Sequence, residues 1–205
     1  MPRRFTGDTL VLASYNPSRS RSCGRLWPTT GVTVRSAGGL GLAEPEETEP
    51  DFRGNAALKA HAAAGAAGLP ALADDSGLEV QRARRPAGRA FRPLGRAGEG
   101  LRRRHGPRHR RYRQALRRLG RRGQARRLRQ HVLCLAWPDG HSELFEGRIA
   151  GTLLETPRGA GGFGYDPIFV PEGENRTFAE LSRAEKSALS HRGIAMRALL
   201  DAVFR

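Results

Sequence analysis

An acidic motif at residues 71–77, Ala-Leu-Ala-Asp-Asp-Ser-Gly, constrains the fold of this 205-residue chain more than any other feature. A short apolar run ends in two adjacent carboxylates, Asp74 and Asp75, and a Ser-Gly pair is expected to turn the chain there. This pattern is typical of a strand that delivers acids to the rim of an α/β sheet. Neighbouring carboxylates suit a hard divalent cation, and one can take a proton from an attacking water. A solvated strand-to-turn junction is the alternative interpretation.

Three further motifs accompany the acidic one. They are an acidic loop at 44–48 (Glu-Pro-Glu-Glu-Thr), a glycine-rich segment at 161–169 (Gly-Gly-Phe-Gly-Tyr-Asp-Pro-Ile-Phe) and a basic segment at 185–192 (Glu-Lys-Ser-Ala-Leu-Ser-His-Arg). Taken in their order along the chain, the four motifs resemble those of the inosine triphosphate pyrophosphatase family. The resemblance is close over about residues 9–17, 32–80 and 132–204.

The resemblance implies an α/β fold with a long twisted mixed β-sheet, flanking helices and two lobes around a nucleotide cleft, in a single domain over 1–205. It also implies an enzyme that hydrolyses deaminated purine nucleoside triphosphates (dITP, ITP, XTP or dXTP) to the monophosphate and pyrophosphate. Such an enzyme requires Mg²⁺, removes deaminated purine nucleotides from the nucleotide pool and forms a homodimer. Because the sequence has no signal peptide and no apolar stretch long enough to cross a bilayer, we expect a cytoplasmic protein without membrane contacts.

The local patterns predict most of the elements of this fold. Residues 9–17 read as a buried strand that runs into a turn, 31–36 as a second strand and 69–75 as a third. An alanine-rich helix is expected from Asp51 to Gly68, and a β-hairpin over 132–148. A capping box, Ser-Arg-Ala-Glu at 182–185, announces the last helix. Helical spacing predicts that its apolar residues Leu189, Met196, Leu199, Leu200 and Val203 face the core.

The resemblance also implies roles for individual residues. Asp75, with Asp74, would activate water, and Asp75 would bind the metal with an acid of the 44–48 loop, where Glu47 is our first choice and Glu46 our second. Lys186 would contact the nucleotide, and His191 and Arg192 would read the 6-keto edge of the base. The substrate-binding residues implied in this way are Ser14, Tyr15, Asn16, Pro17, Ser18, Arg19, Asn55, Lys59, Ser76, Phe163, Gly164, Tyr165, Asp166, Lys186, His191 and Arg192.

Two segments depart from the family pattern. In the first, Arg19 stands where the family's phosphate loop has Lys, and residues 18–30 lack the helical periodicity expected there. The second segment, residues 81–131, contains 20 of the 36 basic residues of the chain and a single acid, Glu99. The rest of the chain carries a net charge of −3 although the whole carries +16.

Three explanations of the basic segment compete. It is an arginine-rich arm that binds nucleic acid, a solvated low-complexity insert, or the product of a shifted reading frame in a GC-rich gene. We favour the shifted frame for 81–131 and for 18–30, because the basic segment holds no Lys and matches the length of an ordered family segment. Nucleic acid is then not expected as a partner. The alternative is an Arg-rich nucleic-acid-binding protein or an inactive family member.

The two cysteines, Cys23 and Cys134, have no metal-ligand spacing. Cys134 lies in an apolar run, so we expect it to be a buried thiol that packs as a small hydrophobic side chain.

Overall fold

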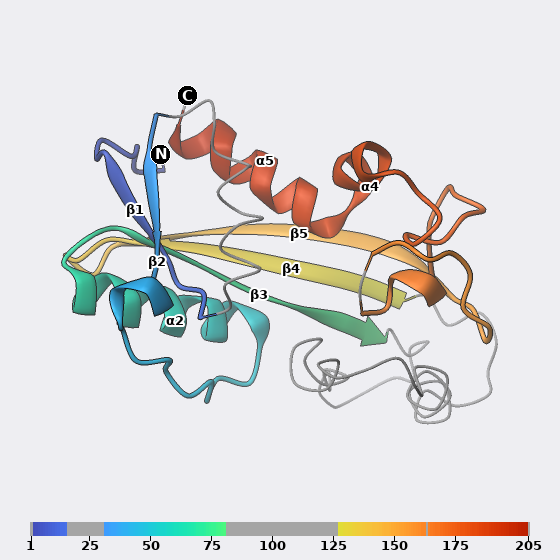
Figure 1. Cartoon of the computed structure of the whole chain (residues 1–205), viewed down its shortest axis with the longest axis horizontal. Helices are drawn as coiled ribbons and strands as arrows, with labels where there is room; N and C mark the ends of the chain where they lie inside the picture. Colours follow the sequence, from blue (N-terminus) through green and yellow to red (C-terminus); the bar gives the residue numbers. More distant parts are fainter. Residues whose placement is uncertain (1, 16–30, 81–126, 163, 205) are drawn as a thin grey trace, which may run out of the picture. The chain divides into compact units, whose positions relative to one another are not determined.

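The computed structural model describes residues 2–15, 31–80, 127–162 and 164–204. Predictions on residues 18–30 and 81–126, and on Asn16, Pro17 and Phe163, therefore lie outside the described residues. The elements shown in Figure 1 are β1 (Thr9–Leu12), β2 (Thr33–Ser36), the 3-10 helix η1 (Gly38–Leu40), α2 (Phe52–Ala67), β3 (Ala71–Val80), β4 (Arg127–Ala136), β5 (Ser142–Leu153), the 3-10 helix η2 (Asp166–Ile168), β6 (Phe169–Pro171), α4 (Arg183–Leu189) and α5 (His191–Val203).

Within the described part of the chain, six strands form one sheet in the order β2-β1-β3-β4-β5-β6. β1 pairs in parallel with both β2 and β3, whereas β5 and β6 are antiparallel. The sheet is therefore mixed, which confirms the predicted α/β fold with flanking helices. The nucleotide cleft between two lobes stays a prediction.

The chain divides into two compact units, and β3, β4 and β5 each contribute residues to both. Unit 1 comprises Met1–Asp75, His131–Glu146 and Ala195–Arg205, and unit 2 comprises Ser76–Gln130 and Gly147–Ile194. The prediction of a single domain over 1–205 stays a prediction.

The core of unit 1 has a cluster of apolar side chains on each face of its strands. Alternate strand residues point to opposite faces, so Leu72 joins the cluster that contains Met196 and Leu199 of α5, while its neighbours Ala71 and Ala73 join the one that contains α2. Figure 1 shows α2 and α5 on opposite sides of these strands. Both faces of the strands are therefore covered, as expected of parallel strands in an α/β protein.

Helix α2 has the ends that its sequence predicts. The side chain of Asp51 caps its start by accepting a hydrogen bond from the Gly54 N–H at 2.8 Å. Gly68 ends it in the left-handed conformation, with φ of 63°. Its buried alanines recur at helical spacing and let the helix pack closely on the strands; they are Ala56, Ala60, Ala63 and Ala64.

Unit 2 has its own smaller apolar cluster, built around two aromatic rings. Phe169 and Phe178 stack with their ring centroids 5.4 Å apart, and both are buried. Leu78 of β3 and Leu181 complete the buried part of this cluster. Because Leu78 is buried in this cluster, the chain continues as a strand past the acidic motif instead of turning at Ser76.

Four sequence expectations are corrected by the structure. The strand predicted to end at Asp75 continues to Val80, and the strand expected to start at Val132 begins at Arg127. The single last helix is two helices, separated at Ser190 by an extended backbone with ψ of 149°. This break changes the helical phase, so Leu189 is 37% exposed and its predicted place in the core is wrong.

Candidate active site

The adjacent acids Asp74 and Asp75 lie in the middle of β3, where successive side chains point to opposite faces of the sheet. Asp75 is only 8% exposed, and Asp74 is more accessible. Burial of a carboxylate is costly unless a cation or hydrogen-bond donors lie nearby.

Lys59 of α2 supplies the cation. Its ammonium donates hydrogen bonds to Glu47 Oε1 at 2.9 Å and to the backbone carbonyl of Asp74, and it lies 4.0 Å from Asp75 Oδ1. Lys59 is itself buried. Helix α2, the 44–48 loop and β3 thus converge on one ammonium group in unit 1.

The acidic loop presents its two candidate acids differently. Glu47 is partly buried and paired with Lys59, whereas Glu46 is exposed. The preference for Glu47 over Glu46 as a metal ligand stays a prediction.

Asn55 and Tyr15 hold the two ends of this loop. The Asn55 amide donates to the carbonyl of Glu49 at 3.0 Å, and its oxygen accepts from the Glu49 N–H at 3.1 Å. The Tyr15 hydroxyl donates to the Ala43 carbonyl at 2.8 Å. Burial, with the nearby Glu44 carboxylate, raises the pKa of Tyr15, which keeps the phenol protonated as this donor. The described contacts of both residues shape the loop that carries Glu47.

His131 was not among the sequence-predicted site residues. It lies on β4, is 2% exposed, and its Nε2 is 3.9 Å from Asp74 Oδ2. Ser14, at the end of β1, is also buried in unit 1, and its carbonyl accepts from the Gly38 N–H at 3.4 Å.

The donor set of unit 1 fits a magnesium ion. Within the described residues, no three His, Cys, Asp or Glu side chains form a metal-binding group. However, Glu47 and Asp75 both approach one cationic atom, the Nζ of Lys59. Because Mg²⁺ commonly takes one or two carboxylates and completes its shell with water and substrate phosphates, two carboxylates are sufficient. They suit an ion that arrives with a triphosphate.

Unit 2 contains a second polar cluster, centred on Asp166. This carboxylate is fully buried, and each of its oxygens accepts from a different cation: Oδ1 from Arg129 and Oδ2 from Lys186, both at 2.6 Å. The Arg129 guanidinium also lies near the rings of Phe169 and Phe178. Burial raises the pKa of the neighbouring Tyr165, and the charge of Arg129 opposes that rise.

The glycine-rich segment fits tightly around this carboxylate. Gly162 has φ of 69°, and a Cβ atom at this position would lie 2.3 Å from Asp166 Oδ2. Gly159 has φ of 80°, and a Cβ there would lie 2.6 Å from the backbone of Ala179. These two glycines therefore let the backbone lie close to the protein's own groups.

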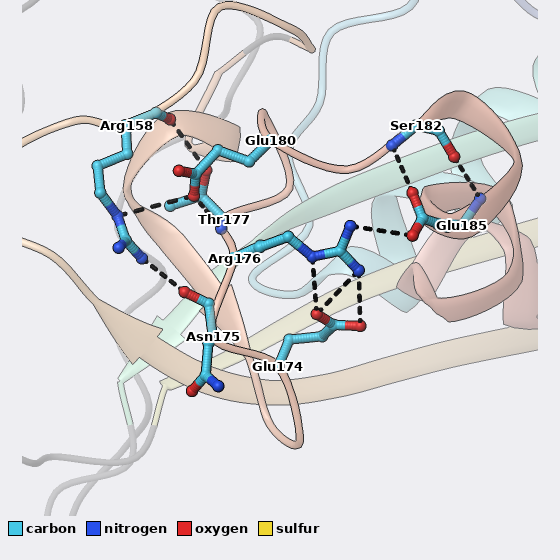
Figure 2. Close-up of polar contacts among 8 residues, drawn as sticks. All are labelled: Arg158, Glu174, Asn175, Arg176, Thr177, Glu180, Ser182 and Glu185. Atoms are coloured by element: carbon cyan, nitrogen blue, oxygen red, sulfur yellow. Dashed lines mark hydrogen bonds and ion pairs between the residues drawn. The ribbon is translucent and has the colours of Figure 1, made fainter.

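Lys186 reaches Asp166 from α4, whose first turn is held by the contacts in Figure 2. Ser182 and Glu185 form the predicted capping box, in which each side chain binds the other's backbone N–H. Arg176 joins this turn to the preceding loop by pairing with Glu185 at 3.0 Å and with Glu174 at 3.2 Å. The capping box therefore fixes the start of the helix that carries Lys186.

A second set of contacts in Figure 2 closes the same loop. Arg158 donates to the carbonyl of Asn175 at 2.7 Å, and its own carbonyl accepts from the Thr177 hydroxyl at 2.9 Å. Glu180 accepts from the Thr177 N–H at 2.7 Å.

The base-reading candidates His191 and Arg192 stand at the start of α5. The Ser190 hydroxyl caps this start by accepting from the Gly193 N–H at 3.1 Å, and the Ser190 N–H donates to the Lys186 carbonyl at 2.8 Å. His191 is buried and Arg192 is partly buried. Lys186, His191 and Arg192 all belong to unit 2. The half-buried Tyr165 and Ser76 and the buried Gly164 belong to the same unit.

Comparison with known proteins places these residues in a family. The model of the Ham1 family matches residues 10–202. The chain belongs to the Ham1 family. A dITP/XTP pyrophosphatase of Gluconobacter oxydans is 47% identical to this Ham1 protein over 205 residues, which cover 98% of this chain and 93% of the relative. Another, from Rhodospirillum centenum, is 48% identical over 204 residues, which cover 99% of this chain and 98% of the relative.

A solved structure agrees with the family membership. The Staphylococcus aureus Ham1 protein matches this chain with a TM-score of 0.76 at 28% identity, over 94% of this chain and 96% of that one. The family expected from the four sequence motifs is thereby confirmed. In the described residues of this Ham1 chain, no helix is both long and apolar enough to cross a membrane.

Proposed function

We propose that this chain is a Mg²⁺-dependent pyrophosphatase that converts dITP, ITP, XTP or dXTP to the monophosphate and pyrophosphate. The observation that carries the proposal is its 47% and 48% identity, over nearly the full length, to two proteins named dITP/XTP pyrophosphatase. The acidic cluster of unit 1 supports it, because that cluster offers the groups that such a hydrolysis needs.

Unit 1 is assigned to the triphosphate. Glu47 and Asp75 would hold Mg²⁺, for which their carboxylate oxygens are suitable ligands, with Glu46 as the second choice in the loop. When bound, this ion would neutralise charge on the phosphate oxygens. The Lys59 ammonium, already within hydrogen-bond reach of Glu47, adds a fixed positive charge beside the same carboxylates.

Asp75 is assigned as the general base, with Asp74 as its neighbour in the same role. A base must lie near the water that it activates, and Asp75 lies in the strand that also carries Asp74, 4.0 Å from the ammonium of Lys59. The carboxylate takes one proton from water as the water oxygen bonds to a phosphorus of the α–β phosphoanhydride. The anhydride P–O bond breaks at the same phosphorus, which gives the monophosphate and pyrophosphate. Ser14 and the 15–19 loop, of which residues 16–19 lie outside the described part, are assigned to the phosphates.

Unit 2 is assigned to the base. Lys186 would contact the nucleotide, and His191 and Arg192 would donate to the 6-keto oxygen of hypoxanthine or xanthine. Adenine presents an amino group at this position, so the same donors would be left without an acceptor. Tyr165 offers a flat face for the purine ring, and Asp166 holds Lys186 in place. The cleft between two lobes, the homodimer and the cytoplasmic location are proposed from the family resemblance.

The decisive experiment measures pyrophosphate release by the purified chain from dITP, XTP and dATP with Mg²⁺. We expect release from dITP and XTP, with kcat/KM for dATP lower by at least about 100-fold. Asp75→Asn keeps the size of the side chain but removes the base, and should lower kcat by about 100-fold to 10,000-fold. A folded wild-type chain that releases no pyrophosphate from either substrate would refute the assignment.

A further inference from the structure

We infer that Arg129 is a positioning residue of the base-binding half, and that it acts on Lys186 through the carboxylate that both residues share, Asp166. The inference rests on the proposed function, in which Lys186 contacts the nucleotide. All three residues belong to unit 2. Arg129 also lies in the arginine-rich segment 81–131, so the inference concerns this chain in the reading frame that its sequence has.

Arg129 and Lys186 bind the same carboxylate but differ in how deeply their side chains are buried. Each takes one oxygen of Asp166 at 2.6 Å, so both ends of the planar carboxylate are engaged. Arg129 comes from strand β4 and its side chain is 7% exposed, whereas the Lys186 side chain on α4 is 23% exposed. Arg129 is therefore the buried, fixed end of the chain of contacts, and Lys186 is the end that solvent and a ligand can reach.

The surroundings strengthen this link. The guanidinium of Arg129 lies 5.4 Å from the ring centroid of Phe178, and the Lys186 ammonium lies 6.0 Å from the same centroid. Phe178 is 1% exposed. In such apolar surroundings ionic interactions are stronger than in water, and cation–π contacts restrict where both cations can lie.

Removal of Arg129 has a specific consequence. Oδ1 of Asp166 would lose the cation that Arg129 supplies, while Oδ2 would keep its hydrogen bond from Lys186, so the negative charge of the carboxylate would act on Lys186 alone among these two cations. Lys186 would then be held back from the nucleotide by a stronger ion pair. Because this loss affects binding in the ground state and the transition state alike, KM should rise while kcat stays near its wild-type value.

A double-mutant cycle tests whether Arg129 acts through Lys186. The variants are Arg129→Met, Lys186→Met and the two combined, with KM and kcat measured on dITP and the Kd of dIMP measured by calorimetry. We expect Arg129→Met alone to raise KM and Kd by about tenfold with kcat within about twofold of wild type. In the Lys186→Met background the same substitution should change neither constant, because its route to the nucleotide is already gone.

Several outcomes would overturn the inference. An equal rise of Kd in both backgrounds would show that Arg129 acts independently of Lys186, and a fall in kcat at constant KM would place it in the chemical step. Arg129→Lys keeps a cation beside Asp166, so it should restore Kd to within about threefold of wild type even if Arg129→Met does not fold. A Kd for Arg129→Lys raised tenfold or more would also overturn it. The Kd of dIMP is measured without turnover, so a wild-type chain that binds dIMP but releases no pyrophosphate would refute the proposed hydrolysis alone.

Discussion

Lys59 donates a hydrogen bond to Glu47 at 2.9 Å and lies 4.0 Å from Asp75, so one buried ammonium serves both of the proposed metal ligands. Without the lysine, two partly desolvated carboxylates would face each other with less compensation. We expect Lys59→Met to lower the free energy of unfolding by about 3 kcal/mol. Added Mg²⁺ should stabilise this variant more than the wild type, because a cation would replace the lost charge. Urea unfolding with and without Mg²⁺ measures both effects.

A matched control for Lys59→Met exists on the same helix. Arg53 pairs with Glu146, but its side chain is 55% exposed, so Arg53→Met should cost no more than about 1 kcal/mol and show no added response to Mg²⁺. If Mg²⁺ stabilised wild type and Lys59→Met equally, the assignment of Glu47 and Asp75 as metal ligands would lose its support.

Gly162 and Gly164 form a second matched pair. Both have positive φ, 69° and 61°, so alanine at either position costs about 1 kcal/mol in backbone conformation. At 162 the new Cβ would also meet a carboxylate oxygen of Asp166, at 2.3 Å, whereas at 164 no atom of the described residues beyond the chain neighbours lies within 4 Å. Gly162→Ala should therefore displace Asp166, lower stability well beyond Gly164→Ala and raise the Kd of dIMP. Thermal melts and calorimetry on the two variants test this, and equal effects would contradict the contact.

The local elements followed from sequence wherever one pattern dominated. Asp51, the alanine spacing and Gly68 gave α2 almost to the residue, and the capping box at Ser182 marked the start of α4. The break at Ser190 was missed because an apolar stripe continues through it, and the stripe does not reveal that a serine hydroxyl caps a new helix there.

The strand boundaries and the partners of the acids depended on tertiary packing. β3 extends through Leu78 because Leu78 is buried in the apolar cluster of unit 2. The Ser-Gly pair before it is typical of a turn, so the sequence did not predict this extension. The arginine-rich composition around Arg129 and His131 gave no sign that these two residues lie beside Asp166 and Asp74.

The full-length comparison bears on the arginine-rich segment itself. An alignment of 204 residues covers 99% of this chain and 98% of the Rhodospirillum centenum relative, so the two chains have nearly the same length. An added arm of about fifty residues would have left a gap of that size. The agreement in length argues against insertion of a new segment of this size, and the shifted reading frame stays a prediction.

Cys134 offers a test of the unit 1 core. It is fully buried on β4, and this burial raises the pKa of its thiol to about 12, although a hydrogen bond with Ser142 opposes the rise. The reactive thiolate is therefore scarce at pH 8. In a Cys23→Ser variant, which leaves one thiol, we expect no reaction with a disulfide reagent in the native state and complete reaction in denaturant. Rapid native reaction would show that β4 opens or that the core is not packed as described.

The capping box of α4 should make stability depend on pH in a defined range. Hydrogen bonds from Ser182 and the charge of Arg176 lower the pKa of Glu185 to about 2, from an ordinary value of 4.5. A carboxyl whose pKa falls on folding stabilises the native state above its unfolded pKa and loses that contribution as pH falls through the folded value. The contribution should thus be complete above about pH 5 and vanish toward pH 2.

Glu185→Gln keeps an acceptor for the Ser182 N–H but cannot titrate, so the difference in unfolding free energy between wild type and this variant should shrink over that range. Ser182→Ala removes the cap itself and should cost about 1 kcal/mol near neutral pH. Urea unfolding from pH 7 to pH 3 measures both variants, and a wild-type minus Glu185→Gln difference that stayed constant would show that the charge of Glu185 contributes nothing to the helix that carries Lys186.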